Sequence, residues 1–213
     1  MPDKMRGRPY VWPSWITKLL AGEEHCWWRA WYKSHYKYEK VPDDPERAEF
    51  FREWTAKHDA ITQRRAQELR DQGYLLKIEE EGQFKLVGDR ADLSGKPDIV
   101  AMKDSEALVV DAKSGRRRES DHWQVLLYIF ALPMSWLQGY SLRGEVEYQG
   151  CREQVRPMSP EVREKIVQAM RKITGTDSPS AVPSQFECRY CDIASCPVRW
   201  RSEDEHGDAR GFF

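Results

Sequence analysis

The chain has 213 residues, of which 40% are hydrophobic and 32% are charged, a composition typical of a soluble globular domain with a modest appendage. Its 34 basic residues are balanced by 35 acidic ones, so the overall charge gives no argument for nucleic-acid binding, and any such site must come from local clustering. No apolar run is long enough to span a membrane and the N-terminus lacks the apolar core of a secretory signal, so a cytoplasmic location is expected.

Two long helices are predicted in the N-terminal third of the chain. Ser14 can cap a helix over residues 15–36, which is rich in aromatic side chains. The prolines and aspartates of residues 41–45 predict a break. A second helix follows over residues 46–70 and is ended by Gly73.

Short segments with strand-like patterning dominate the middle of the chain. Strands are expected over residues 74–78, 84–87, 97–102, 107–112, 144–149 and 154–156. A helix over residues 122–131, capped by Ser120 or Asp121, separates the fourth strand from the fifth. Ser159, followed by Pro160, predicts the start of a last helix that runs to Gly175.

This order of elements predicts an α/β or α+β sandwich in which helices flank a mixed, largely antiparallel sheet. We expect an N-terminal helical segment over residues 1–45 and a core over residues 46–175. Residues 176–213 would form a linker rich in Pro, Ser and Thr, a cysteine-rich segment and a solvated tail from Ser202.

The most informative stretch covers residues 95–113, where two apolar runs flank a short polar segment in the pattern of a β-hairpin. With the turn at residues 104–105, Asp98 lies opposite Asp111. Lys113 is two residues further along the strand, so its side chain points to the same face. The hairpin therefore predicts that two carboxylates and a lysine project together from one surface of the sheet.

Two directly opposed carboxylates destabilise a sheet unless something compensates their charge. A divalent cation such as Mg²⁺, which prefers oxygen ligands, would do so. Lys113 would add a positive charge where a phosphate could bind, which completes the parts of metal-assisted phosphodiester cleavage. The alternative is that Asp98 and Asp111 are ordinary strand-end residues on a hydrated face.

Two helices could support this site. Gln124 and Tyr128 are four residues apart and share one face of the helix that follows Lys113. His58 lies on the apolar face of the long helix, and a neutral imidazole is a good ligand for Mn²⁺-type metals. The alternatives are that Gln124 is exposed, that Tyr128 belongs to the core and that His58 is a buried histidine with satisfied hydrogen bonds.

These elements resemble the RecB-like branch of the PD-(D/E)xK nucleases, whose motifs stand here in the expected order. They are Lys57-His58-Asp59, Gly95-Lys96-Pro97-Asp98, Asp111-Ala112-Lys113 and Gln124-x-x-x-Tyr128. The resemblance implies a restriction-endonuclease-like core and a DNA nuclease that depends on Mn²⁺ or Mg²⁺. It implies metal ligation by the side chains of His58, Asp98 and Asp111 and by the main-chain oxygen of Ala112. It gives Lys113 a direct part in the chemistry, with Gln124 and Tyr128 supporting the site and the DNA.

The chain has five cysteines, and in the absence of a secretion signal their clustering indicates metal binding more than disulfides. Cys188, Cys191 and Cys196 form a C-x₂-C-x₄-C-P run that needs a fourth ligand. Cys26 begins an aromatic stretch similar to the N-terminal cysteine segment of iron–sulfur RecB-like nucleases. The resemblance implies a [4Fe–4S] cluster that joins the two ends of the chain, with Zn²⁺ as the alternative occupant. Cys151 has no partner and is expected to be an ordinary residue.

The resemblance extends from about Ser14 to Pro197 and is greatest to the CRISPR-associated RecB-like exonucleases. It implies an exonuclease acting on DNA with single-stranded character during CRISPR spacer acquisition, with integrase subunits as partners. The run Arg116, Arg117 and Arg118 would contact this DNA, although a charge run is often only a solvated loop. A recombination or repair exonuclease outside CRISPR systems is one alternative. A catalytically silent DNA-binding or redox-sensing module is another.

Overall fold

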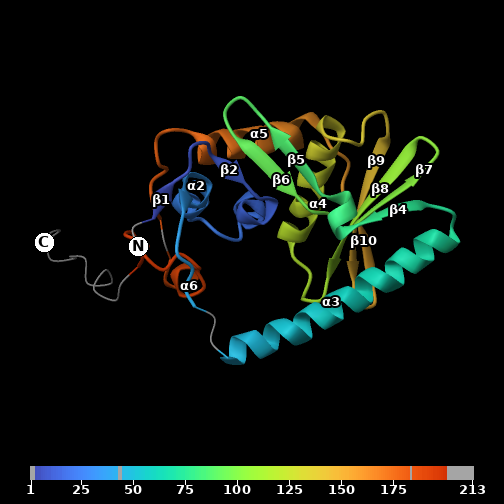
Figure 1. Ribbon diagram of the computed structural model, residues 1–213, viewed down its shortest axis with the longest axis horizontal. Coiled ribbons are helices and arrows are strands. Elements are labelled where there is room, and N and C mark those ends of the chain that lie inside the picture. Colours follow the sequence, from blue (N-terminus) through green and yellow to red (C-terminus); the bar gives the residue numbers. More distant parts are fainter. Residues whose placement is uncertain (1–2, 43–44, 183, 201–213) are drawn as a thin grey trace, which may run out of the picture.

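The computed structural model describes residues 3–42, 45–182 and 184–200, so the predicted solvated tail lies outside the described residues. Its main sheet has five strands in the order β10-β9-β8-β7-β4 (Figure 1). Only β8 and β9 are parallel, and the other neighbouring pairs are antiparallel. The strands are β4 (Leu75–Ile78), β7 (Ile99–Lys103), β8 (Glu106–Lys113), β9 (Ser141–Tyr148) and β10 (Arg152–Gln154). The expected mixed, largely antiparallel sheet is confirmed.

A second sheet has three strands in the order β2-β6-β5, and the short strands β1 and β3 pair separately. Their bounds are β1 (Lys4–Met5), β2 (Tyr10–Val11), β3 (Tyr36–Lys37), β5 (Phe84–Val87) and β6 (Asp92–Gly95). Of these, only β5 was predicted. Strands of two residues are too short to carry an alternating pattern, and β6 consists of Asp, Leu, Ser and Gly, which read as a turn.

The predicted helix over residues 15–36 is wrong, because two helices occupy this region: α1 (Thr17–Ala21) and α2 (Trp27–His35). Gly22 ends α1 in the left-handed conformation, with φ of 74°. Ser14 does not cap it, since this residue lies inside the 3₁₀ turn η1 (Pro13–Trp15). The break also places Glu23 beside Ser120, far along the chain. The Glu23 carboxylate accepts hydrogen bonds from the backbone N–H and the hydroxyl of Ser120 at 3.0 and 2.8 Å.

Helix α4 (Glu119–Ala131) connects the parallel strands β8 and β9 and lies between the two sheets (Figure 1). Neither Ser120 nor Asp121 is its N-cap, as had been expected; that position belongs to Arg118. The Asp121 carboxylate instead reaches back to accept a hydrogen bond from the backbone N–H of Arg118 at 3.1 Å. The start of α4 is therefore stabilised by two acidic side chains that satisfy its free N–H groups.

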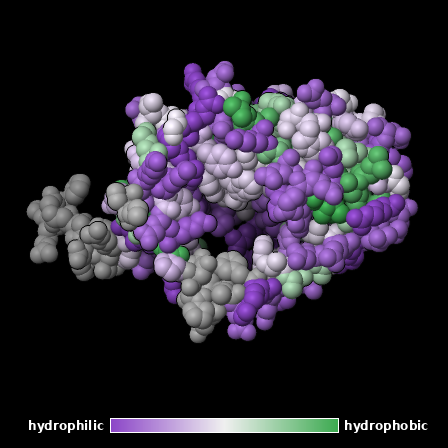
Figure 2. Space-filling view, in the orientation of Figure 1, coloured by the Kyte–Doolittle hydropathy of each residue, from purple (hydrophilic) through white to green (hydrophobic). Residues whose placement is uncertain are grey.

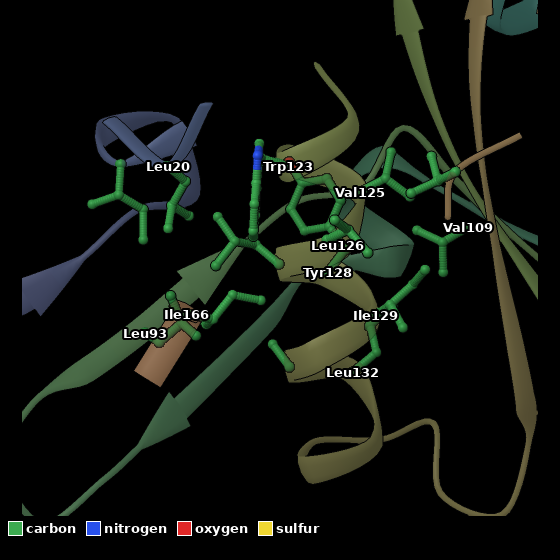
Figure 3. Packing of buried hydrophobic residues seen from close by; sticks show 14 of the residues in the cluster. Leu20, Leu93, Val109, Trp123, Val125, Leu126, Tyr128, Ile129, Leu132 and Ile166 are labelled. Atoms are coloured by element: carbon green, nitrogen blue, oxygen red, sulfur yellow. The ribbon is translucent and has the colours of Figure 1, made fainter. Parts of the chain in front are cut away.

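Helix α4 is buried on almost all sides, which explains its apolar sequence (Figure 3). Its side chains pack against Leu20 of α1, Leu93 of β6, Val109 of β8 and Ile166 of α5 (Pro160–Thr174). One core thus unites residues from the N-terminal segment, both sheets and α5. Ser159 caps α5 as predicted, accepting a hydrogen bond from the backbone N–H of Val162.

Helix α3 (Pro45–Asp71) covers the opposite face of the main sheet from α4 (Figure 1). Alternate residues of β8 separate the two faces: Val109 belongs to the α4 core, whereas Val110 packs with Leu69 of α3. Gly73 follows the end of α3 with φ of 82°, in agreement with the predicted termination. The remaining elements are the 3₁₀ turns η2 (Glu79–Gly82) and η3 (Leu132–Met134) and the short helix α6 (Gln185–Arg189). No helix in the described residues combines the length and the apolarity needed to cross a bilayer.

An ion pair fastens α3 to the sheet. Arg65 of α3 donates to both carboxylate oxygens of Glu145 on β9, at 2.7 and 3.2 Å, and the two side chains are only 5% and 2% exposed. Glu147 extends the network by accepting from Arg64 and Arg152 at 2.8 and 2.7 Å. The position of α3, and of any residue that it carries, depends on these buried charges.

Arg65→Met is expected to lower the free energy of unfolding by about 3 kcal/mol, because buried Glu145 loses its bidentate partner and keeps only its contacts with Arg152 at 3.3 Å and Gln154 at 2.9 Å. Arg143→Met, on the strand β9 that also carries Glu145, is the matched control. Its partner is Glu106, and both side chains are more than half exposed, so the loss should stay below about 1 kcal/mol. Chemical denaturation of both variants measures the difference, and equal losses would contradict a structural role for the buried pair.

Candidate active site

The β7–β8 hairpin has the predicted register, with Ile99 opposite Val110 and Lys103 opposite Glu106. Asp104 lies at the turn in the left-handed conformation, with φ of 54°. Asp98 directly precedes β7, and Asp111 lies near the end of β8. The structure therefore brings both predicted acids to the same end of the hairpin.

Asp98 links the sheet to α3. Its Oδ2 atom accepts a hydrogen bond from the backbone N–H of Ala112 at 2.7 Å and lies 3.1 Å from Nε2 of His58. The hydrogen bond to Asp98 raises the pKa of His58 more than burial lowers it. The carboxylate and the imidazole can thus share one proton or one cation.

Asp111 is almost fully buried, with 1% exposure. Its Oδ1 atom accepts a hydrogen bond from Nε2 of Gln124 at 3.0 Å. Its Oδ2 atom is 2.5 Å from Nζ of Lys113, yet it accepts no hydrogen bond of acceptable geometry from the described residues. Burial raises the pKa of Asp111 to about 7 against the opposing charge of Lys113. A buried carboxylate oxygen without a directional partner is a natural cation ligand.

A chain of hydrogen bonds connects Lys113 to the core. Nζ of Lys113 donates to Oε1 of Gln124 at 3.2 Å, and Nε2 of Gln124 lies 2.9 Å from the Tyr128 hydroxyl. Tyr128 donates in turn to the carbonyl of Lys96 at 3.1 Å. Burial acts to lower the pKa of Lys113, but the charge and hydrogen bond of Asp111 together with the charges of Asp98 and Asp121 outweigh it and the pKa is raised, so the ammonium stays protonated. Tyr128 belongs both to the core and to this network.

A cleft of about 270 Å³ opens above Lys113 and Gln124, and Figure 2 shows the molecule hollowed near its centre, with hydrophilic residues around the recess. Arg116 and Arg118 line this cleft. Arg117, the third predicted DNA contact, does not, because it pairs with Glu153 at 3.0 Å. The cleft is also lined by residues that the sequence did not indicate as part of the site, among them Ser14, Lys18 and Trp54. Only Trp54 carried a signal, since it precedes His58 by one helical turn.

The four predicted cluster ligands, Cys26, Cys188, Cys191 and Cys196, line one small pocket between the two ends of the chain. All are free thiols, and Cys151 packs elsewhere, against the main core. In the described ranges, no group of three or more His, Cys, Asp or Glu side chains is close enough together to bind a metal ion. Four convergent thiols are nevertheless a donor set suited to iron or zinc.

Helix α6, which the sequence analysis did not predict, positions these cysteines. Glu187 accepts hydrogen bonds from the backbone N–H groups of His25 and Cys26 at 2.7 and 3.0 Å. Cys188 accepts one at its sulfur from the backbone N–H of Trp200 at 3.2 Å. The early and late cysteine segments are thereby joined by protein contacts alone.

The chain is similar to known proteins over much of its length. Over 125 residues the chain is 25% identical to the CRISPR-associated exonuclease Cas4/endonuclease Cas1 fusion of Leptospira interrogans, a match that covers 52% of this chain but only 23% of that protein. The crystal structure of SSO0001 is similar with a TM-score of 0.47 and 12% identity, covering 93% of this chain and 90% of that one. The family model of the PD-(D/E)XK nuclease superfamily matches residues 17–201. The chain therefore belongs to the PD-(D/E)XK nuclease superfamily.

Proposed function

We propose that the protein is a metal-dependent deoxyribonuclease whose active site is the Asp98–Asp111–Lys113 surface. The observation that carries this proposal is the buried Oδ2 atom of Asp111, which lies 2.5 Å from Nζ of Lys113 but accepts no hydrogen bond of acceptable geometry in the described residues. Lys113 itself lines a cleft together with Arg116 and Arg118. Two opposed carboxylates and a lysine at one place have little structural value, whereas a cation and a phosphate would satisfy all three.

The residues divide the chemistry between them. Asp98, Asp111, His58 and the main-chain oxygen of Ala112 would hold Mn²⁺ or Mg²⁺, which when bound acidifies a water molecule and polarises the phosphate. Lys113 would stabilise the negative charge that develops on the phosphate. Gln124 orients Lys113 through its 3.2 Å hydrogen bond, and Tyr128 orients Gln124.

The substrate assignment rests on the family and on the charge of the cleft. Arg116 and Arg118 would contact phosphates of the DNA. The test is degradation of end-labelled single-stranded DNA, duplex DNA and RNA of one sequence, with Mg²⁺ or Mn²⁺. Loss of label from DNA with either metal supports the proposal, and degradation of RNA alone would overturn the choice of substrate.

Lys113→Ala is expected to lower turnover by about 10²–10³-fold and to change Mn²⁺ affinity far less, because the ammonium acts mainly on the negative charge that develops on the phosphate. Cleavage rate and calorimetric metal affinity should be measured on one preparation. Lys103→Ala, at the turn end of the same hairpin, is the control, since Nζ of Lys103 donates to the carbonyl of Gln72 and lies over the ring of Tyr74, away from the site. An unchanged rate in Lys113→Ala would show that this lysine is merely part of the basic loop.

We further propose that Cys26, Cys188, Cys191 and Cys196 hold a [4Fe–4S] cluster. The four thiols line one pocket, and the ligand spacing differs from that of zinc ribbons, which pair two short C-x-x-C knuckles. The cluster would be structural, because hydrolysis of a phosphodiester needs no electron transfer. Zinc at the same four thiols is the alternative.

The biological role that we infer is exonucleolytic trimming of DNA for CRISPR spacer acquisition, in the cytoplasm and with integrase subunits as partners. The likeness to a CRISPR-associated exonuclease Cas4/endonuclease Cas1 fusion supports this role. A recombination or repair exonuclease outside CRISPR systems is the first alternative, and the identity of the neighbouring genes distinguishes it from the proposed role. A catalytically silent DNA-binding or redox-sensing module is the second, and the cleavage assay distinguishes it from a nuclease.

A further inference from the structure

Trp54 is the exposed aromatic side chain at the mouth of the candidate active site. It lies on α3 and lines the same cleft as Lys113 and Gln124. Its exposed fraction is 39%, whereas Ile61 and Leu69 further along α3 are 3% and 1% exposed. Exposing so large an apolar surface beside a polar cleft has no value for folding, which suggests that a ligand covers it.

The indole is held in a fixed orientation. Its ring stacks on the imidazole of His58, with centroids 5.6 Å apart and planes inclined by 22°. The carbonyl of Trp54 also faces the hydroxyl of Ser114, the residue after Lys113, at 3.5 Å. The stacking places the ring beside the imidazole, and the Ser114 contact places the Trp54 backbone beside the segment that carries Lys113, so a flat group resting on the ring would lie next to the reacting phosphate.

The rest of the cleft offers charge and hydrogen bonds. Arg116 and Arg118 line it, and neither forms a salt bridge among the described residues. Ser14 and Lys18 line it as well. The acidic Asp121 also contributes to the lining, but its carboxylate is occupied by the Tyr148 hydroxyl at 3.0 Å and the backbone of Arg118. An aromatic platform beside cations is the combination that binds single-stranded nucleic acid.

We propose that Trp54 stacks on an unpaired base next to the scissile phosphate, which makes the cleft selective for single-stranded DNA. This inference rests on the proposed nuclease function and deepens it. Every base presents a flat π-face, so the contact tolerates any sequence. In a duplex these faces are already stacked on their neighbours, so Trp54 could engage one only after the strand is opened.

A simpler role is that Trp54 only holds His58 in place. Binding measurements separate the two roles, because a base-stacking residue acts on DNA affinity whether or not the metal is bound. We would measure fluorescence anisotropy of labelled single strands and duplexes in an Asp111→Asn background, which prevents cleavage. Trp54→Ala should weaken single-strand binding by about 5-fold to 150-fold, the range found for one base–aromatic stack. Trp54→Phe should retain most of the affinity.

Phe186→Ala is the matched control, since Phe186 is 72% exposed and does not line the cleft. It should leave binding unchanged. The decisive arm uses a short single strand with one abasic position, moved along the strand. With Trp54 present, one position should weaken binding several-fold, and in Trp54→Ala that penalty should disappear, because the contact has already been removed.

The possible results are distinct. Equal losses on single strands and duplexes, or an abasic penalty that persists in Trp54→Ala, would overturn the stacking role while leaving the nuclease proposal intact. If protein with Trp54 intact binds neither form of DNA, the proposed function itself fails, and this inference with it.

Discussion

Asp98→Asn and Asp111→Asn should each lower the rate of DNA cleavage by about 10³-fold or more. Each substitution removes a charged oxygen ligand, and a bound cation supplies several kcal/mol of transition-state stabilisation that would be lost. Asparagine keeps the shape of the side chain, so the loss can be assigned to charge. Initial rates on labelled DNA with saturating Mn²⁺ measure the effect.

Asp104→Asn is the matched control, because Asp104 belongs to the same hairpin but lies at the turn, where asparagine also tolerates the left-handed conformation. It should cleave at the wild-type rate. Asp111→Asn should also be folded and slightly more stable above neutral pH. Burial raises the pKa of Asp111 from 3.8 to about 7, so its ionisation destabilises the native state increasingly as the pH rises through that interval. A fully active Asp98→Asn or Asp111→Asn variant would reject the assigned site.

Cys26→Ala should abolish the brown colour of anaerobically purified protein as completely as Cys188→Ala does. Both residues would be ligands of one [4Fe–4S] cluster, although Cys26 and Cys188 lie in the N-terminal and C-terminal parts of the chain. Wild-type protein should contain about four iron atoms per chain. Both variants should also unfold at a lower temperature, because the free energy of binding a metal centre is partly free energy of folding.

Cys151→Ala should keep both the colour and the stability, since Cys151 does not line the cysteine pocket. If the wild-type protein is colourless and contains stoichiometric zinc, the bound metal is zinc and not iron, and the assignment of the four ligands is unaffected. If Cys26→Ala retains its iron, Cys26 is not a ligand, and the proposal that the cluster joins the two ends of the chain is wrong.

The hairpin was predictable from sequence because a turn sets the register of the strands beside it. Once residues 104–105 form the turn, the partner of every residue follows, and the observed pairing of Ile99 with Val110 agrees. Helix α3 was predictable for a similar reason. Apolar residues recur along it at helical spacing, and Gly73 ends it. The strongest predictions thus concerned elements whose geometry is determined locally.

The features that the sequence did not reveal depend on contacts between distant segments. The predicted helix over residues 15–36 ran through Gly22, which ends α1 in the left-handed conformation, and the contact of the following Glu23 with Ser120 joins segments that are distant in sequence. Likewise, nothing in the arginine run distinguishes Arg117 from its neighbours, although Arg117 pairs with Glu153 and does not line the cleft. Such choices follow from tertiary packing, which a linear pattern does not contain.

The most direct test of the proposed metal centre is to compare single-turnover cleavage with Mn²⁺ occupancy over the same range of Mn²⁺ concentration. Calorimetry would give the occupancy and a labelled single strand the rate. We expect the wild-type rate to rise in proportion to occupancy and to vanish in EDTA, and Asp111→Asn to show neither binding nor cleavage. Wild-type cleavage that continues in EDTA, or an Asp111→Asn variant that cleaves at the full rate, would contradict the proposal that a cation held by Asp98 and Asp111 performs the hydrolysis.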